Sequence, residues 1–202
     1  MNMSTKNHKL KVGLDFDGVI VDHTKNKILV AQRYGFSIAP YQIVGRRLKK
    51  LVPETVYRQI QNDVYGQLTL AAPIMKDANQ VIKCLSNTIE LFLVSRRQSP
   101  LFRLMAKKWL INNLPKIFSV KNTIFVDTNR DKSAVCRQRG INVFLDDHSS
   151  VLERLDSVPH RYWFDQYDSS DDLDCQGLIA VKSWKDFLVK VKRLSIAQPS
   201  DR

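Results

Sequence analysis

The chain has 202 residues, of which 44% are hydrophobic, and a formal net charge of +12 at pH 7. This length and composition predict one domain with a sizeable core and room for a small insert. The apolar runs are far shorter than the roughly 20 residues that cross a bilayer, so we expect no membrane partner. The positive charge favours an anionic partner, which includes phosphorylated metabolites, nucleotides and nucleic acids.

The basic residues form two clusters that contain no interleaved aromatic side chains. One cluster holds Arg46, Arg47, Lys49 and Lys50, and the other holds Lys190, Lys192 and Arg193. Surfaces that bind single-stranded nucleic acid combine positive charge with aromatic stacking platforms. We therefore interpret both clusters as solvated faces, although the charge alone does not exclude nucleic acid.

The three cysteines indicate a reducing compartment. Cys84, Cys136 and Cys175 lie far apart, and an odd number cannot form a complete disulfide framework. We therefore expect a soluble, unsecreted protein of the cytoplasm. Cys84 and Cys136 fall in helical patterns, where we expect them to be small core residues.

The first predicted strand, residues 12–14, is a short apolar run that ends at Asp15. Two helical patterns follow, one with Ile28, Leu29 and Tyr34, and one that Pro53 opens and that ends before Gly66. We interpret residues 22–72 as a small helical cap inserted over the active site. Periodicity alone does not distinguish such a cap from a helical side layer of the main domain.

The next elements alternate between helices and strands. A helix over residues 78–85 precedes a strand that ends at Ser95, and Ser99 with Pro100 caps a helix that carries Leu101, Leu104, Met105 and Trp109. A strand over 123–126 ends at Asp127, a helix runs over 131–139, and a strand over 143–145 ends at Asp146.

The remaining residues predict a surface loop, a last helix and a frayed tail. Residues 165–177 contain five Asp and read as a loop, and Ser183 with Asp186 forms a capping box for the last helix. Residues 195–202 read as the tail. The alternation predicts an α/β fold with a Rossmann-like, mostly parallel sheet covered by helices on both faces. Its core would comprise residues 1–21 and 73–202.

The strongest chemical signal is a pair of acidic strand ends. Asp15 and Asp17 flank Phe16 and precede Gly18, and Asp146 and Asp147 follow another predicted strand. The carboxyl ends of parallel strands meet at one edge of a sheet. The negative charge of carboxylates gathered there must be balanced by a cation. Mg²⁺ binds through one or two carboxylates together with substrate phosphate. The sequence therefore predicts a Mg²⁺ site at this edge.

These motifs resemble, over about residues 11 to 150, those of the haloacid dehalogenase-like superfamily, whose phosphatases carry four motifs in a fixed order. Here they are residues 15–19, Ser95, Lys132, and Asp146 with Asp147. An Asp at the position of Asp17 is typical of the phosphatases and is usually absent from the dehalogenases.

The resemblance implies a role for each motif residue. Asp15 would be the nucleophile that forms an aspartyl-phosphate and binds Mg²⁺, and Asp17 would be the acid–base residue, with its backbone carbonyl on the metal. Ser95 would hydrogen-bond the phosphoryl oxygens, Lys132 would neutralise negative charge, and Asp146 with Asp147 would complete the metal site.

Further residues are candidates for other roles. Arg46, Arg47 and Arg96 are expected to contact the substrate. Asp22 would organise the entrance to the cap, and Asp127 is expected to be structural. His23, His148 and His160 show no metal-ligand spacing, so we expect them at the surface or behind the catalytic residues.

Several alternatives remain open. Ser95 also fits a simple cap of the following segment, and Lys132 also fits a solvated side chain. The predicted function is hydrolysis of a small phosphomonoester. Phosphotransferases and mutases share its first step, and a non-catalytic phosphate- or nucleic-acid-binding protein is the other alternative.

The substrate and the oligomeric state stay open. The insert, the residues 145–147 and a Trp near the last helix resemble 5′(3′)-deoxyribonucleotidases. The basic cap shows no evident aromatic pair to stack a base, so sugar phosphates remain candidates.

Overall fold

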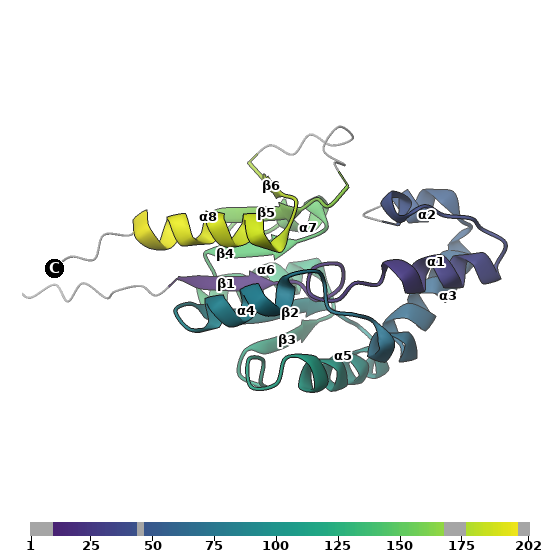
Figure 1. The fold of residues 1–202 in the computed structure, drawn as a ribbon, viewed down its shortest axis with the longest axis horizontal. Coiled ribbons are helices and arrows are strands. Elements are labelled where there is room, and N and C mark those ends of the chain that lie inside the picture. Colours follow the sequence, from purple (N-terminus) through teal and green to yellow (C-terminus); the bar gives the residue numbers. More distant parts are fainter. Residues whose placement is uncertain (1–9, 44–46, 168–176, 198–202) are drawn as a thin grey trace, which may run out of the picture.

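The computed structural model describes residues 10–43, 47–167 and 177–197. Its centre is a six-stranded sheet in the order β3-β2-β1-β4-β5-β6, and every neighbouring pair is parallel (Figure 1). The strands are β1 (Lys11–Leu14), β2 (Glu90–Arg96), β3 (Thr123–Val126), β4 (Val143–Asp146), β5 (His160–Phe164) and β6 (Ile179–Val181). The predicted Rossmann-like parallel sheet is confirmed.

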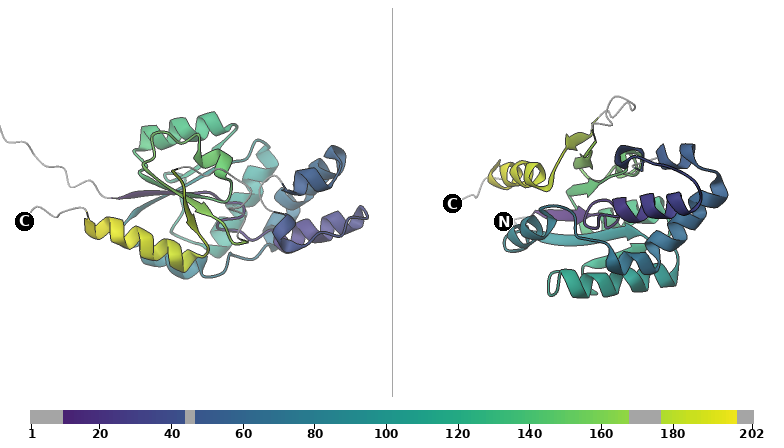
Figure 2. Two further views of the ribbon diagram at one scale, coloured as in Figure 1. Left: turned by 90° about the horizontal axis from the view of Figure 1, so that it is seen from above. Right: turned by 45° about the vertical axis from the view of Figure 1, so that its right-hand side comes forward.

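Helices cover both faces of the sheet, as Figure 2 shows. Alternate strand residues point to opposite faces, so one cluster of buried side chains packs under α4, α5 and α8 and another under α6 and α7. These helices are α4 (Ala78–Ser86), α5 (Pro100–Asn113), α6 (Asn129–Arg139), α7 (Ser149–Leu152) and α8 (Trp184–Ala197). In the described ranges, no helix is long and apolar enough to cross a membrane.

A helical insert, residues 24–71, lies between β1 and β2 in the chain and beyond the carboxyl ends of the strands (Figure 1). It contains α1 (Thr24–Arg33), α2 (Arg47–Leu51), α3 (Glu54–Tyr65) and the short 3-10 helices η1 (Pro40–Gln42) and η2 (Gln67–Ala71). Its buried apolar residues form a cluster of their own. Its two connections lie side by side, because Asp22 N–H donates to the Pro73 carbonyl at 2.9 Å.

Two buried tryptophans fix the ends of the insert. Trp184 Nε1 donates to the Val19 carbonyl at 2.9 Å, in the loop after β1. Trp109 Nε1 donates to the Ala72 carbonyl at 2.7 Å, where the chain returns to the core. A buried indole N–H needs such a partner, so these two side chains anchor the segments that carry the site.

The helices predicted around Ile28 and from Pro100 are present as α1 and α5, but not every apolar residue that indicated them is buried. Leu101 and Leu104 are exposed, and α5 instead buries Met105, Ala106, Trp109 and Leu110. On α1, Leu29 is exposed, whereas Val30 and Ala31 are buried and Ile28 packs against the same cluster; Tyr34, which follows the helix, is also exposed. These shifts follow from helices that are apolar over more than one face, where periodicity fixes the rotation poorly.

Helix starts also differ in detail. Ser99 precedes α5 but makes no side-chain capping bond. The helix expected from residue 131 starts at Asn129, because Thr128 and Asp131 form the capping box. Before α8, Ser183 accepts from Asp186 N–H at 3.1 Å, but the Asp186 carboxylate accepts from Lys182 N–H.

The cysteines are partly as predicted. Cys136 is buried, but Cys84 is exposed, since it lies off the face of α4 that buries Val81, Ile82 and Leu85. Cys175, Arg46 and most of the predicted loop over 165–177 lie outside the described residues.

Candidate active site

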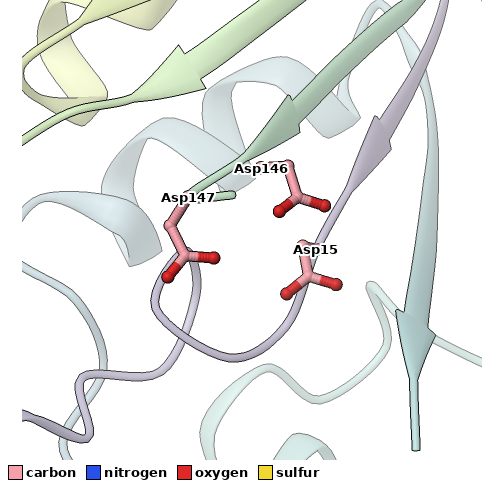
Figure 3. Close-up of side chains that lie close together, drawn as sticks. All are labelled: Asp15, Asp146 and Asp147. Carbon is pink, nitrogen blue, oxygen red and sulfur yellow. The ribbon is translucent and has the colours of Figure 1, made fainter. Parts of the chain in front are cut away.

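Three carboxylates meet at the carboxyl edge of the sheet. Asp15 follows β1, Asp146 ends β4, and Asp147 comes next in the chain. Because β1 and β4 are paired in parallel, their carboxyl ends lie together, and one oxygen from each side chain lies within 4.8 Å of the others (Figure 3). We call Asp15, Asp146 and Asp147 the carboxylate cluster.

Lys132 of α6 lies within hydrogen-bonding distance of two members of this cluster. Its Nζ is 2.7 Å from Asp15 Oδ1 and 2.6 Å from Asp146 Oδ2, and its side chain is 2% exposed. Burial alone would lower the pKa of Lys132, but the carboxylates of Asp146 and Asp15 raise it above its ordinary value. Lys132 is therefore a buried cation, and the alternative of a solvated lysine is wrong.

One ammonium group does not balance three carboxylates. Burial, together with the charges of Asp15 and Asp147, raises the pKa of Asp146 to about 6 against the opposing effect of Lys132. Burial also raises the pKa of Asp147. Among the described residues, Asp147 Oδ1 is buried without a hydrogen-bond partner. An excess of buried negative charge and an orphaned oxygen fit a hard divalent cation.

Asp17 lies in the opposite electrostatic environment. Its Oδ1 is 2.7 Å from His23 Nε2, its Oδ2 accepts from Arg97 Nε at 3.0 Å, and Arg97 Nη2 also donates to Oδ1. Burial alone would raise the pKa of Asp17, but Arg97 and His23 together bring it well below the usual range. The cluster around Asp15 does not include the Asp17 side chain.

His23 is buried behind Asp17. Burial lowers its pKa although its contact with Asp17 opposes the shift. A neutral ring that donates from Nε2 to Asp17 leaves Nδ1 as an acceptor, and this atom has no partner in the described part of the chain. Of the two expected positions, His23 is therefore not at the surface but is buried against Asp17.

Gly18 allows the loop to pass the cluster. Its φ is +81°, and a Cβ built there would lie 2.2 Å from Asp147 Oδ2. Any side chain would therefore strain the backbone and displace a carboxylate of the cluster.

The other predicted site residues lie in different parts of the fold. Ser95 is buried near the carboxyl end of β2, the strand beside β1. Arg96 is exposed. Arg47 begins α2 of the insert and donates to the Tyr41 carbonyl at 3.3 Å. Arg97, which contacts Asp17, was not among the predicted site residues. The sequence does place two arginines directly after Ser95, and only the first of them was a candidate.

A small cavity lies among the helices of the insert, and His148 of the core borders it. Its volume is about 20 Å³, which is room for about one water molecule. Its polar lining comes from Lys27, Tyr57, Gln61 and Tyr65 of the insert and from His148 of the core, and its apolar lining comes from Ile43, Leu48, Ile60 and Val64. Tyr57 and Tyr65 thus supply two aromatic rings that the sequence analysis did not single out.

Comparisons with known proteins identify the fold. No protein-family model and no curated protein matches the chain. A haloacid dehalogenase-like hydrolase from Streptococcus pneumoniae superposes with a TM-score of 0.64 at 13% identity, covering 91% of this chain and 98% of that one. For a predicted phosphatase from Clostridium acetobutylicum the TM-score is 0.63 at 12% identity, covering 92% and 99%.

A third solved structure, a candidate β-phosphoglucomutase from Bacteroides vulgatus, gives a TM-score of 0.60 at 16% identity and covers 94% of this chain and 90% of that one. Each of the three superpositions covers at least 90% of both chains. This chain has the fold of the haloacid dehalogenase-like hydrolases.

Proposed function

We propose that this protein is a Mg²⁺-dependent phosphohydrolase that cleaves a small phosphomonoester through an aspartyl-phosphate at Asp15. The observation that supports this most is the position of Asp15. Its carboxylate is buried at the edge of the sheet, 2.7 Å from the ammonium group of Lys132 and beside Asp146 and Asp147. A nucleophile and the positive charge that offsets phosphate repulsion thus lie together.

The carboxylate cluster and the backbone carbonyl of Asp17 would hold the metal. When bound, Mg²⁺ would offset the charge of the carboxylates and of the phosphoryl oxygens. Lys132 would hold Asp15 in place and neutralise charge on the phosphoryl group, and Ser95 would hydrogen-bond its oxygens. Arg46, Arg47 and Arg96 remain candidates for contacts with distal parts of the substrate.

The reaction has two displacements at phosphorus. In the first, a carboxylate oxygen of Asp15 bonds to phosphorus and the bond to the leaving oxygen breaks. Asp17, whose low pKa means that it must take up a proton from solvent before this step, gives that proton to the leaving oxygen. In the second, Asp17 takes a proton from water, whose oxygen attacks phosphorus and releases phosphate from Asp15. Covalent catalysis of this kind divides one difficult displacement into two easier ones.

The insert would act as a cap over residues 22–72, and the leaving group would lie between the insert and the carboxyl ends of the strands. The cavity within the insert has room for only about one water molecule, so it does not select the leaving group. Nucleosides and sugars both remain candidates for the leaving group. A cytoplasmic location would match the reduced cysteines.

The direct test is phosphoenzyme trapping with an aryl phosphate. Wild type should need Mg²⁺ and stop in chelator. Asp15→Asn should show neither turnover nor label, because the nucleophile is lost. Asp17→Asn should keep the first step with this good leaving group and accumulate label on the Asp15 peptide, because water activation is slowed about 10²- to 10⁴-fold.

Asp156→Asn, which changes an exposed carboxylate, is the matched control and should behave as wild type. Turnover in Asp15→Asn, or full activity in chelator, would reject the mechanism. Transfer of label to an added alcohol in preference to water would identify a phosphotransferase, and binding of nucleic acid without turnover would favour a non-catalytic role.

A further inference from the structure

Arg97 is a buried cation that the mechanism above does not use. It follows β2 directly, and its side chain is 1% exposed, although Arg96 beside it is exposed. Burying a guanidinium group is costly unless its charge is paired and its N–H groups are hydrogen-bonded. The contacts of Arg97 should therefore reveal what the arginine does.

The guanidinium group contacts three separate parts of the fold. Nε and Nη2 donate to the two oxygens of Asp17, as a planar fork suits a carboxylate. Nη1 donates to the Phe102 carbonyl of α5 at 2.7 Å and to the Tyr65 carbonyl of the insert at 3.1 Å. The group also lies 4.9 Å from the ring centre of Phe16.

The backbone of Arg97 is held as well. Arg103 Nε donates to the Arg97 carbonyl at 2.6 Å, and Arg103 Nη2 pairs with Asp127 at the end of β3. Asp127 thus has the structural role that the sequence analysis expected. Hydrogen bonds therefore hold both the side chain and the backbone of Arg97. The orientation of its guanidinium group does not depend on Asp17 alone.

We propose that Arg97 is the positioning residue for Asp17 and that it links the acid–base carboxylate to the insert through Tyr65. Asp17 Oδ2 accepts one hydrogen bond from Arg97 and keeps a second lone pair for the proton that moves in catalysis. Arg97 acts through Asp17 and does not touch the substrate. This inference rests on the proposed function.

If Arg97 positions Asp17, its replacement should affect activity differently from a general loss of stability. If Arg97 orients Asp17, its replacement should harm most those reactions that depend on protonation of the leaving oxygen. Alkyl phosphates depend on it strongly, and aryl phosphates depend on it little. Substrate affinity should hardly change, since the phosphoryl group is bound by other residues.

The experiment compares kcat and KM of wild type, Arg97→Met and Arg97→Lys on an alkyl and an aryl phosphate in Mg²⁺. Arg97→Met should lose at least about tenfold more kcat on the alkyl phosphate, within the range of an acid–base group. KM should change less than about threefold, and Arg97→Lys should recover part of the loss because it keeps the charge without the fork. Arg137→Met, at an exposed position on α6, is the control.

A double-variant cycle separates positioning from stability. In the Asp17→Asn background, Arg97→Met should change kcat less than about threefold, since residues that act as a unit are not additive. The double variant also removes both charges of the buried pair, so it should fold even if Arg97→Met alone does not. In that case Arg97→Lys supplies the leaving-group comparison.

Equal losses on both substrates, or additive losses in the cycle, would overturn the positioning role. Failure of the proposed function would look different, because wild type itself would then lack Mg²⁺-dependent turnover and label on Asp15.

Discussion

Replacing Lys132 by Met tests the charge balance of the site. The ammonium group is buried between Asp15 and Asp146, and its loss leaves the carboxylate cluster without the cation that contacts it. Removing one partner of a buried pair costs about 3–5 kcal/mol. In a protein of this size each kcal/mol lowers Tm by about 2–4 °C, so we expect a fall of roughly 6–20 °C in chelator at pH 7.5.

Mg²⁺ and acid should each restore part of this stability, for different reasons. A bound cation supplies positive charge among the same carboxylates, and at one hundred times its Kd it contributes about 2.7 kcal/mol. At lower pH, Asp146 takes up a proton, and the repulsion falls. Activity should be lost in all conditions, because the proposed mechanism also assigns Lys132 the neutralisation of charge on the phosphoryl group.

The assay is thermal unfolding in chelator and in Mg²⁺ at two pH values. Lys107→Met is the control, because Lys107 is exposed on α5 and its replacement also places Met in a helix. If both variants fall by the same one or two degrees, Lys132 does not balance buried charge and the reasoning is refuted.

Two further predictions concern the same cluster. In chelator, the raised pKa of Asp146, about 6 against 3.8, means that the folded state binds this proton more tightly than the unfolded state. Its stabilising effect is complete below about pH 4 and is lost as pH rises through 6, by up to about 3 kcal/mol. Urea unfolding should show this fall in wild type and a flatter profile in Asp146→Asn. Gly18→Ala should weaken Mg²⁺ binding, measured as the Mg²⁺-dependent rise in Tm, because its Cβ displaces Asp147. Gly35→Ala has the same positive φ, with nothing within 4 Å of the added Cβ, and should keep that rise; equal behaviour of the two variants would contradict the clash.

Much of the fold follows from local sequence, because apolar runs ending in polar residues specify buried parallel strands. The strands that sequence reasoning missed lack this signal. Strand β5 starts with His160 and Arg161 and then carries aromatic residues, and β6 has three residues with Ile179 exposed. The pairing of β5 with β4 and of β6 with β5 stabilises these strands, which is a tertiary effect that local propensity does not report.

Part of the candidate site could likewise be predicted from local sequence, and part could not. Asp15 and Asp146 could be predicted because each ends its own strand, and parallel pairing then brings them together. The contact between Asp17 and Arg97 spans 80 positions in the chain. Sequence places two arginines after Ser95, but only the exact end of β2 decides that Arg96 faces solvent while Arg97 is buried.

The two aspartates of the first loop have different partners, and this difference gives a last prediction. Lys132 contacts Asp15 within the carboxylate cluster, whereas Arg97 contacts Asp17, whose side chain is not part of it. Divergent environments of this kind let two carboxylates perform different roles. A cation bound by the cluster can replace the charge of Lys132 but is not held by the Asp17 side chain.

We therefore expect Mg²⁺ to recover more of the stability lost in Lys132→Met than of that lost in Arg97→Met, relative to its effect on wild type. Unfolding curves of the three proteins with and without Mg²⁺ measure this difference. An equal recovery in both variants would mean that one electrostatic site contains both aspartates. The separation of the nucleophile from the acid–base residue would then have to be abandoned.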